Sequence, residues 1–453
     1  MTQGGQATLS RVWRCLFDSR GASPLVIQVW RCLFDSRGTS PLVKIIYLLK
    51  DFNKILVYGE RDEGAYRQIV ECSKEAAYAV LCADHHLGYS MPIGGVVAYE
   101  DYISPSGVGF DIACGNKAVL TDLMAEDIEI KKIMDEIVNK ISFGLGRHNP
   151  KPISHPVLDK IEKCNIKPVK KLINLARSQL GTVGSGNHYV DLFKDVKGRL
   201  WIGVHFGSRG FGHKIAMGFL ALARGMRFDE KPKDANSMDA SPTLFKIQSE
   251  LGQDYFEAMK LAGDYAYAGR DTVVEKVLEI LGARNLFTVH NNHNFAWQET
   301  HFGRKYWVVR KGCTPAFPGQ LSFIGATMAG ESVIVEGLDS EESRKALFST
   351  VHGAGRVMSR IKAAGRKKWM RDKFGFKAPR VIEKGLIDFN KTKHTMRNMN
   401  IELRGGGADE SPEVYKNLNE VLNYHKNTIR ILHRLTPIGV AMAGEDIYDP
   451  YKD

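Results

Sequence analysis

Short runs of β-branched and apolar residues recur along most of this 453-residue chain, and they limit the folds that it can adopt. Apolar residues at helical spacing predict two longer elements, helices at residues 243–282 and 415–435. A polar stretch at 227–242 predicts a surface loop before the first helix. The pattern therefore predicts a globular α+β protein, with strands at residues 54–58, 96–99, 200–204, 306–309 and 332–335.

The composition argues against a membrane protein or a secreted one. No apolar run reaches the roughly 18 residues that a spanning helix needs, and Arg11, Arg14 and Arg20 interrupt the layout of a secretory signal. Seven cysteines are few for this length and odd in number, which favours a reducing compartment with free thiols or metal ligands. We therefore expect a cytoplasmic protein without a membrane segment.

The N-terminus contains a tandem duplication. Residues 12–21 recur unchanged at 29–38, and residues 23–26 recur at 40–43. Two copies are too few for a solenoid, which needs about three units to bury a core. We expect Cys15 and Cys32, which lie within the duplication, to be packing or incidental thiols rather than ligands. We expect a non-catalytic N-terminal extension, a single catalytic domain and a short C-terminal tail, with boundaries at 1–50, 51–444 and 445–453.

Most of the net charge of +12 lies in one basic block, residues 356–397. This block holds 14 Lys or Arg against three acidic residues, a local net charge of +11, and Trp369 and Phe374 lie among the charges. Such a block suits a nucleic-acid backbone, because cations neutralise phosphates and aromatic rings stack on bases. A solvated helix face is the alternative interpretation of a basic run.

Four glycine-flanked or asparagine-flanked segments together offer a set of five ligands and predict a metal centre. Asp111 and Cys114 lie three residues apart between glycines, and His188 ends a Gly-rich loop whose backbone amides and Asn187 suit phosphate oxygens. His205 ends a predicted strand, and His290 and His293 follow another apolar run. Each residue alone fits a structural role. A carboxylate, a thiolate and three imidazoles together are typical of a paired Mn²⁺ or Zn²⁺ site.

His352 is a candidate nucleophile. The segment Gly353-Ala354-Gly355 follows it, so its imidazole is unshielded and its backbone is open to a bulky phosphate. An imidazole can attack phosphorus to form a phosphoramidate, provided that metals neutralise the leaving phosphates. The basic block starts at Arg356, directly after this segment, so the nucleophile and a polyanion-binding surface are neighbours in the sequence.

Taken together, these motifs resemble the RtcB-type RNA ligase family over about residues 51–444. The resemblance is specific because the motifs occur in order, although none would suffice alone. They are Ala83-Asp84-His85-His86-Leu87-Gly88 with Pro92-Ile93-Gly94-Gly95, Gly109-Phe110-Asp111-Ile112-Ala113-Cys114-Gly115, Gly184-Ser185-Gly186-Asn187-His188, His205-Phe206-Gly207-Ser208-Arg209-Gly210, His293-Asn294, Arg310-Lys311-Gly312, His352-Gly353-Ala354-Gly355 and Arg404-Gly405-Gly406-Gly407-Ala408-Asp409-Glu410.

The resemblance implies one large fold, with mixed or antiparallel sheets flanked by helices around a central metal cleft. It implies two Mn²⁺ ions bridged by Cys114, with Asp111 and His188 on one ion and His205 and His293 on the other. His352 would receive GMP from GTP and pass it to an RNA 3′-phosphate, made from a 2′,3′-cyclic phosphate, before a 5′-hydroxyl seals the strand. The implied partners are tRNA halves or broken RNA, and an archease-type activator.

The nucleotide contacts implied by the resemblance are Asn187, His188, Asp191, His293, Asn294, Gly325, Ala326, Thr327, Met328, Ser332, His352, Gly353, Ala354, Gly355 and Tyr415. Three positions depart from the family pattern. Asp191 replaces a Glu, Gly-Ala-Thr-Met at 325–328 replaces Pro-Gly-Ser-Met, and Ala443 replaces the Lys expected at the guanine. These departures leave two alternatives open: a paralogue with altered nucleotide or RNA-end specificity, and a non-catalytic RNA-binding protein.

Overall fold

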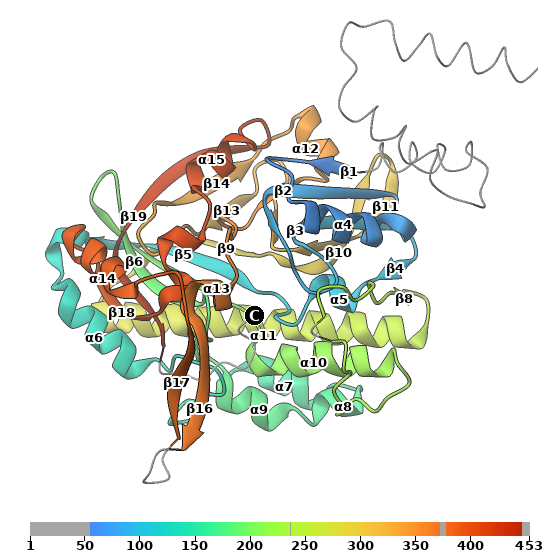
Figure 1. Cartoon of the computed structure of the whole chain (residues 1–453), viewed down its shortest axis with the longest axis horizontal. Helices are drawn as coiled ribbons and strands as arrows, with labels where there is room; N and C mark the ends of the chain where they lie inside the picture. Colours follow the sequence, from blue (N-terminus) through green and yellow to red (C-terminus); the bar gives the residue numbers. More distant parts are fainter. Residues whose placement is uncertain (1–54, 236, 372–376, 446–453) are drawn as a thin grey trace, which may run out of the picture. The chain divides into compact units, whose positions relative to one another are not determined.

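Two sheets form the framework of the computed structural model (Figure 1). The larger has the order β13-β14-β19-β6-β7-β5-β9, with β18 added beside β19, and the smaller has the order β1-β2-β3-β11-β10. Neighbours are antiparallel except β1 with β2 and β18 with β19, so both sheets are mixed. The strands are β1 Ile55–Val57, β2 Tyr78–His86, β3 Ile93–Tyr99, β5 Gly115–Met124, β6 Tyr189–Asp195, β7 Arg199–Phe206, β9 Asn285–Asn292, β10 Asn294–His301, β11 Arg304–Lys311, β13 Leu321–Ile324, β14 Ser332–Gly337, β18 Glu402–Gly406 and β19 Ile429–Gly444.

The structure describes residues 55–235, 237–371 and 377–445, and contacts group Ile55–Asp453 into one unit. The N-terminal duplication with Cys15 and Cys32 lies outside the described residues, as does the tail beyond residue 445. Three short antiparallel pairs complete the strands: β4 Tyr102–Ile103 with β8 Phe245–Lys246, β12 Cys313–Pro315 with β15 Ser349–Val351, and β16 Gly365–Arg371 with β17 Lys377–Lys384.

Helices cover the sheets, and the longest, α11, spans Glu250–Leu281. Ser249 caps its N-terminus by accepting a hydrogen bond from Gly252 N–H, and Gly282 ends it in a left-handed conformation at φ 64°. In Figure 1, α10 and α11 run side by side along the sheets. The other α-helices are α4 Glu63–Cys72, α5 Pro105–Val108, α6 Ile130–Lys140, α7 Pro156–Glu162, α8 Lys167–Lys170, α9 Ile173–Gln179, α10 Arg209–Leu222, α12 Glu341–Lys345, α13 Arg360–Ala364, α14 Phe389–Asn398 and α15 Leu418–Asn423.

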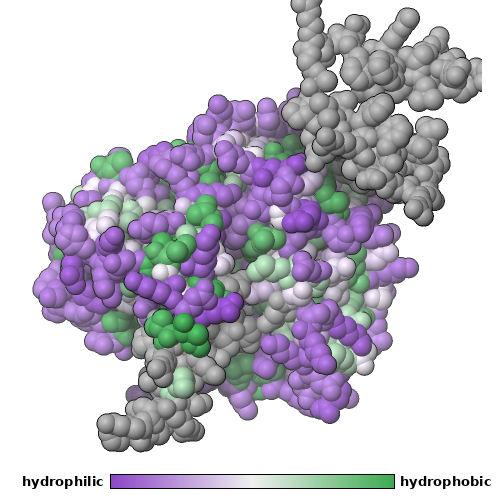
Figure 2. Space-filling view, viewed as in Figure 1, coloured by the Kyte–Doolittle hydropathy of each residue, from purple (hydrophilic) through white to green (hydrophobic). Residues whose placement is uncertain are grey.

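The α+β class is confirmed, and each of the five predicted strands overlaps an observed one. The helix predicted at 243–282 is confirmed as α11, although residues 243–249 hold the short strand β8 instead. The described part of 227–242 has neither helix nor strand, as expected for a loop. No helix in the described part of the chain is long and apolar enough to cross a membrane. Figure 2 shows a mainly hydrophilic face on which hydrophobic residues form small separate groups.

The helix predicted at 415–435 is wrong. Only α15 is helical there, and the chain then enters β19, a 16-residue strand paired with both β14 and β6. Burial in β19 follows the period of a strand, because Ile429 and Leu435 are buried while Arg430 and Leu432 are exposed. Sheet pairing therefore overrides the apparent helical spacing of these apolar residues.

Candidate active site

Four of the five predicted ligands lie where strands of the large sheet end. Cys114 immediately precedes β5, His188 immediately precedes β6, His205 is the next-to-last residue of β7, and His293 directly follows β9. Antiparallel pairing brings these ends together, since Gly115 is opposite both Phe206 and Asn292 and Tyr189 is opposite His205. The fifth residue, Asp111, lies in the turn before Cys114. The sequence-predicted ligands thus meet at one edge of the sheet.

Cys114 is shared by two ligand clusters. Its Sγ lies 3.3 Å from His205 Nε2 and 3.6 Å from His188 Nε2. One cluster is Cys114, His205 and His293, and the other is Asp111, Cys114 and His188; in each, the ligand atoms lie within 4.8 Å of one another. His188 Nε2 is also 3.1 Å from Asp111 Oδ2. The geometry suits two cations that share the thiolate.

The chemistry of these donors also fits bound cations. Burial, with the charge of Asp111, raises the pKa of the Cys114 thiol well above its ordinary value, so a thiolate there needs a cation beside it. Burial lowers the pKa of His205 and of His293, which keeps both rings neutral and able to coordinate. Asp111 Oδ2 is buried, and the group that it faces at 3.1 Å, His188 Nε2, is itself a candidate ligand. Each of these groups becomes satisfied when a divalent ion is bound.

Gly207 leaves room for the Asp111 carboxylate. A Cβ at Gly207 would lie 2.4 Å from Asp111 Oδ1, closer than van der Waals contact permits. Gly207 follows the last residue of β7. The absence of a side chain there lets the strand that carries His205 approach the turn that carries Asp111. The small residue in this motif therefore has a steric function at the candidate metal site.

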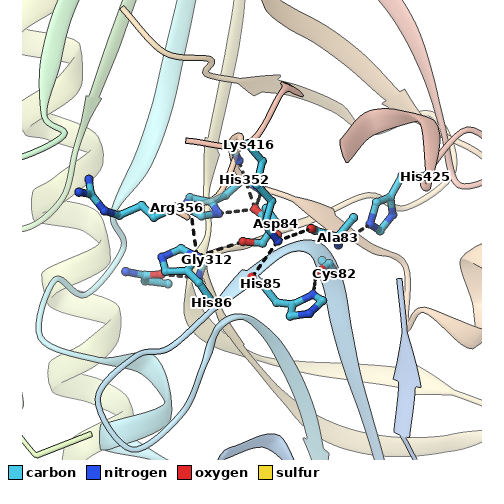
Figure 3. A network of polar contacts seen from close by, with 12 residues as sticks. Cys82, Ala83, Asp84, His85, His86, Gly312, His352, Arg356, Lys416 and His425 are labelled. Carbon is cyan, nitrogen blue, oxygen red and sulfur yellow. Dashed lines mark hydrogen bonds and ion pairs between the residues drawn. The ribbon is translucent and has the colours of Figure 1, made fainter. Parts of the chain in front are cut away.

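His352 lies beside the clusters and is oriented by Asp84 (Figure 3). Its ring centroid is 4.7 Å from that of His293. Asp84 Oδ2 is 2.7 Å from His352 Nδ1 and accepts hydrogen bonds from the backbone N–H groups of His352, at 3.0 Å, and Gly353, at 3.4 Å. Burial favours the neutral acid, yet the charge and hydrogen bonds of His352 outweigh it and lower the pKa of Asp84. An ionised Asp84 therefore holds Nδ1, and Nε2 remains free.

The strand that carries Asp84 is itself anchored from both sides, as Figure 3 shows. Ala83 N–H donates to His425 Nε2 at 3.1 Å. Lys416 Nζ donates to the carbonyl oxygens of Ala83 and His85, at 3.0 Å each. A Cβ at Gly355, where φ is +78°, would lie 2.2 Å from the Asp84 carbonyl oxygen, so the segment after His352 packs directly on this strand.

One cavity of about 830 Å³ joins the metal clusters, His352 and most of the predicted nucleotide contacts. Its size is within the range of small-molecule sites. Ser332 does not line it; its hydroxyl accepts a hydrogen bond from Ala326 N–H at 3.0 Å and so supports the turn at 325–328. The predicted residues that line it are Asp111, Cys114, Asn187, His188, Asp191, His205, His293, Asn294, Gly325, Ala326, Thr327, Met328, His352, Gly353, Ala354, Gly355 and Tyr415.

Asp191 is the departing residue with the clearest structural consequence. It lines the cavity from β6, it is 5% exposed, and its Oδ1 has no hydrogen-bond partner. Burial raises its pKa well above the ordinary value, and a backbone hydrogen bond from Ala441 offsets only part of this. No ion pair of Asp191 occurs among the described residues. A ligand that donates a hydrogen bond would satisfy this carboxyl group.

The first residues of the basic block line the cavity rather than a solvated helix face. Arg356 Nη1 donates to Tyr415 Oη at 3.1 Å, and Arg360 Nη1 lies 3.0 Å from Asp409 Oδ2. Arg360 and Tyr415 also both bond to the Glu410 carboxylate. These contacts fix Tyr415 at the cavity wall. Two arginines and two carboxylates therefore form a hydrogen-bonded network that follows Gly353–Gly355 in the cavity. Further along the block, the described residues include α13, β16, β17 and most of α14.

Two important residues had no role in the sequence prediction. Asp84 lies within the Asp-His-His motif, but its partner His352 is 268 residues away, so no local pattern connects them. Arg270 donates to backbone carbonyls beside two ligands and lies within the apolar face of α11. The sequence signal that marks Arg270 is a cation among small and apolar residues at helical spacing, Ala266, Ala268, Gly269, Val273 and Val274.

Comparison with known proteins agrees with this site. A family model described as "tRNA-splicing ligase RtcB" matches residues 67–443. The chain is 30% identical to the RNA-splicing ligase RtcB of Escherichia coli (strain K12), with 80% of this chain and 89% of that protein covered. It is 31% identical to the tRNA-splicing ligase RtcB of Archaeoglobus fulgidus, with 80% and 87% covered. This chain therefore belongs to the RtcB family.

Proposed function

We propose that this protein is a GTP-dependent and Mn²⁺-dependent RNA ligase, which joins RNA 3′-phosphate or 2′,3′-cyclic phosphate ends to 5′-hydroxyl ends. Membership of a family whose relatives are named RNA-splicing and tRNA-splicing ligases supports the reaction class. The observation that carries the proposal is the position of His352. Its ring is held by a buried carboxylate and faces the same cavity as the two ligand clusters.

His352 acts as the nucleophile in this proposal. Nδ1–H donates to Asp84, so the lone pair on Nε2 attacks the α-phosphorus of GTP. A P–N bond forms, the P–O bond to pyrophosphate breaks, and GMP stays on His352. Positive charge that develops on the ring is stabilised by the Asp84 carboxylate, which stays ionised because its pKa is lowered.

Cys114, Asp111 and His188 would hold one Mn²⁺, and Cys114, His205 and His293 the other. When bound, the ions supply positive charge that neutralises the phosphates during phosphoryl transfer. The protein's own contribution is to orient these donors and to exclude water, since Cys114, His205 and His293 are all buried. Asn187, Asn294, the turn at 325–328 and the segment at 353–355 would bind the nucleotide.

RNA is the second substrate. GMP passes from His352 to the RNA 3′-phosphate, and attack by the 5′-hydroxyl forms the phosphodiester and releases GMP. The net charge of +11 at residues 356–397 supports an RNA-binding surface that starts at the cavity and continues along β16 and β17, which extend away from the sheets in Figure 1. Suitable substrates are tRNA halves or broken RNA, and an archease-type protein would act as activator.

We also infer a cytoplasmic location and three functional segments. The described cysteines, Cys72, Cys82, Cys114, Cys164 and Cys313, are all free, which supports a reducing compartment. Residues 1–50 would be a non-catalytic extension, 51–444 the catalytic domain and 445–453 a tail. Removal of residues 1–50 should leave RNA sealing unchanged, which a truncated protein assayed beside the full chain would test.

A labelling experiment tests the proposed first step. Full-length protein is incubated with Mn²⁺ and GTP labelled at the α-phosphate, and acid-labile label on the protein is measured. We expect label on wild type and none on His352→Ala. Equal labelling of the two proteins would refute the nucleophile. Salt-sensitive RNA binding without any labelling, unaffected by Cys114→Ala, would instead indicate a non-catalytic RNA-binding protein.

A second candidate is the same chemistry with a different nucleotide. The buried and unpaired Asp191, together with Ala443 in place of the expected Lys, favours this alternative. The same experiment with all four labelled nucleoside triphosphates distinguishes the two. Stronger labelling by ATP, CTP or UTP than by GTP would replace GTP in the proposal and leave the role of His352 intact.

A further inference from the structure

Arg270 is a fully buried cation on α11 that has no role in the chemistry proposed above. Its side chain is 0% exposed, on the face of α11 that packs against β5 and β7. Among residues 55–235, 237–371 and 377–445, no carboxylate forms an ion pair with it. A buried charge without a counter-ion is costly, so the contacts that it does make identify what it is used for.

Each hydrogen bond of Arg270 reaches a segment that supplies one ligand of the Cys114–His205–His293 cluster. Nη1 donates to the carbonyl oxygen of Ala113, at 2.9 Å, and Ala113 immediately precedes Cys114. The same nitrogen donates to the carbonyl oxygen of Phe206, at 2.7 Å, directly after His205. Nε donates to His290 Nε2 at 2.8 Å, three residues before His293.

Neighbouring side chains favour the tautomer of His290 whose Nε2 can accept the hydrogen bond from Arg270. His290 Nδ1 faces Asp271 Oδ1 at 3.4 Å, and Lys117 Nζ donates to the same oxygen at 2.6 Å. The Tyr267 ring packs against both partners, 4.0 Å from the His290 ring centroid and 4.8 Å from the Arg270 guanidinium carbon. With Nδ1–H directed to Asp271, Nε2 is free to accept from Arg270.

The guanidinium is suited to this position because its donors point in fixed directions in one plane. Three acceptors on three separate segments are held by one rigid group, whereas a lysine ammonium on a flexible chain gives no such fork. The second cluster differs, because Arg270 donates no hydrogen bond to the segment that holds His188. It reaches the turn that holds Asp111 only through the carbonyl oxygen of Ala113, beside the shared Cys114.

We propose that Arg270 is a positioning residue that fixes Cys114, His205 and His293 as a group and so sets the metal affinity of that cluster selectively. The inference rests on the metal centre of the proposed function. It predicts that loss of Arg270 weakens one metal site much more than the other, with a decrease in affinity of about 10-fold to 100-fold, typical of groups that orient ligands.

The test uses the full-length, metal-free protein and Co²⁺ or Mn²⁺ alone, without nucleotide. Equilibrium dialysis gives the number and affinity of the ions bound, and the thiolate-to-Co²⁺ absorption band reports binding at Cys114. Wild type should bind two ions. Arg270→Met should lose affinity at one site, Arg270→Lys should recover part of it, and Lys276→Met, which removes another cation from α11, should bind like wild type.

The outcomes separate this inference from the proposed function. Wild type that binds no ion would refute the metal centre itself. Two unchanged affinities in Arg270→Met, or an equal loss at both sites, would overturn selective positioning and leave the metal centre standing. If Arg270→Met does not fold, His290→Leu keeps Arg270 and removes its acceptor on β9, together with the contact to Asp271, and should weaken the same site, whereas His290→Gln keeps an acceptor and should not. Identical binding by both His290 variants would also overturn the inference.

Discussion

Asp84 is the residue on which the proposed nucleophile depends most directly. Its carboxylate bonds to the ring and to the backbone N–H of His352, from a position that is 0% exposed. We predict that Asp84→Asn slows labelling of His352 by about 100-fold or more, because a neutral amide no longer stabilises the developing charge or fixes the tautomer. Rapid-quench labelling measures the rate. Asp195→Asn, which alters a buried carboxylate bonded to Arg199, is the control and should label normally; a normal rate for Asp84→Asn would contradict the assignment.

His425 makes stability depend on pH. It accepts a hydrogen bond from Ala83 N–H, and burial lowers its pKa from 6.5 to about 4. The unfolded chain therefore binds a proton between pH 6.5 and 4 that the folded chain does not. The contribution of neutral His425 to the free energy of unfolding is complete above pH 6.5. It is lost as the pH falls to about 4, by up to about 3 kcal/mol.

Urea unfolding of wild type and His425→Gln at pH 7 and pH 4.5 measures this effect. The variant should lose less stability on acidification than wild type, because it lacks the His425 imidazole, which takes up a proton in this interval only when the chain unfolds. His394→Gln, at an exposed position of α14, is the matched control and should follow wild type. A wild-type slope that persists in His425→Gln would show that other groups cause the acid sensitivity.

For single residues, the sequence indicates which side chains suit a metal or nucleotide site, but it does not show which residues they contact in the fold. Asp111, Cys114, His188, His205 and His293 stand beside glycine or asparagine turns, and their chemistry indicates a metal centre before any fold is known. Asp84 acquires its function only from an interaction across 268 residues, and Ser332 lies behind the cavity wall rather than on it. Such relations depend on tertiary packing, which local patterns do not encode.

The hairpin of β16 and β17 is the element to which the RNA-binding prediction belongs. Arg366, Lys367 and Lys368 lie on β16, and the exposed side chains of Val381 and Ile382 lie on β17. We predict that changing the three cations to Ala weakens single-stranded RNA binding. In a plot of log Kobs, the observed association constant for RNA, against log salt concentration, the magnitude of the slope should fall by about 0.7 for each RNA phosphate that the variant no longer neutralises.

A salt titration of RNA affinity tests this prediction. The control removes two exposed cations elsewhere, Lys131 and Lys132 of α6, and should change the slope little. Labelling of His352 by GTP needs no RNA and serves as a check that the hairpin variant is folded. An unchanged slope in the hairpin variant would place the RNA-binding surface elsewhere.

Elements were predicted well where local pattern and tertiary structure agree. The apolar stripe of α11 lies between a Ser cap and a Gly cap, and helix formation and core packing favour the same conformation. Residues 415–435 lack that agreement: Leu418, Val421 and Leu422 do form a short helix, but Ile429 onward gains pairing with both β14 and β6. A strand between two neighbours is determined by its partners, and these lie at 332–337 and 189–195.

At the scale of the whole molecule, the candidate metal centre joins the two sheets. His293 lies between β9 of the large sheet and β10 of the small one, and Cys114, His188 and His205 lie at the edge of the large sheet. An ion bound there adds a further link between segments that backbone hydrogen bonds already join, such as the one from Ala113 N–H to the Asn294 carbonyl oxygen at 2.7 Å. Binding to the folded state only should therefore stabilise the whole unit, by about 2.7 kcal/mol when the free ion is at 100 times its dissociation constant.

Thermal unfolding with and without Mn²⁺ measures this coupling. We predict that chelation lowers the midpoint of wild type by several degrees and that restored Mn²⁺ raises it again. Cys114→Ala removes the shared ligand and should unfold at nearly the same temperature in both conditions. Cys164→Ala, which removes a free thiol that belongs to neither ligand cluster, should keep the full response. A wild-type midpoint that does not respond to Mn²⁺ would contradict the candidate metal centre, because an ion that binds only the folded state must shift the unfolding equilibrium.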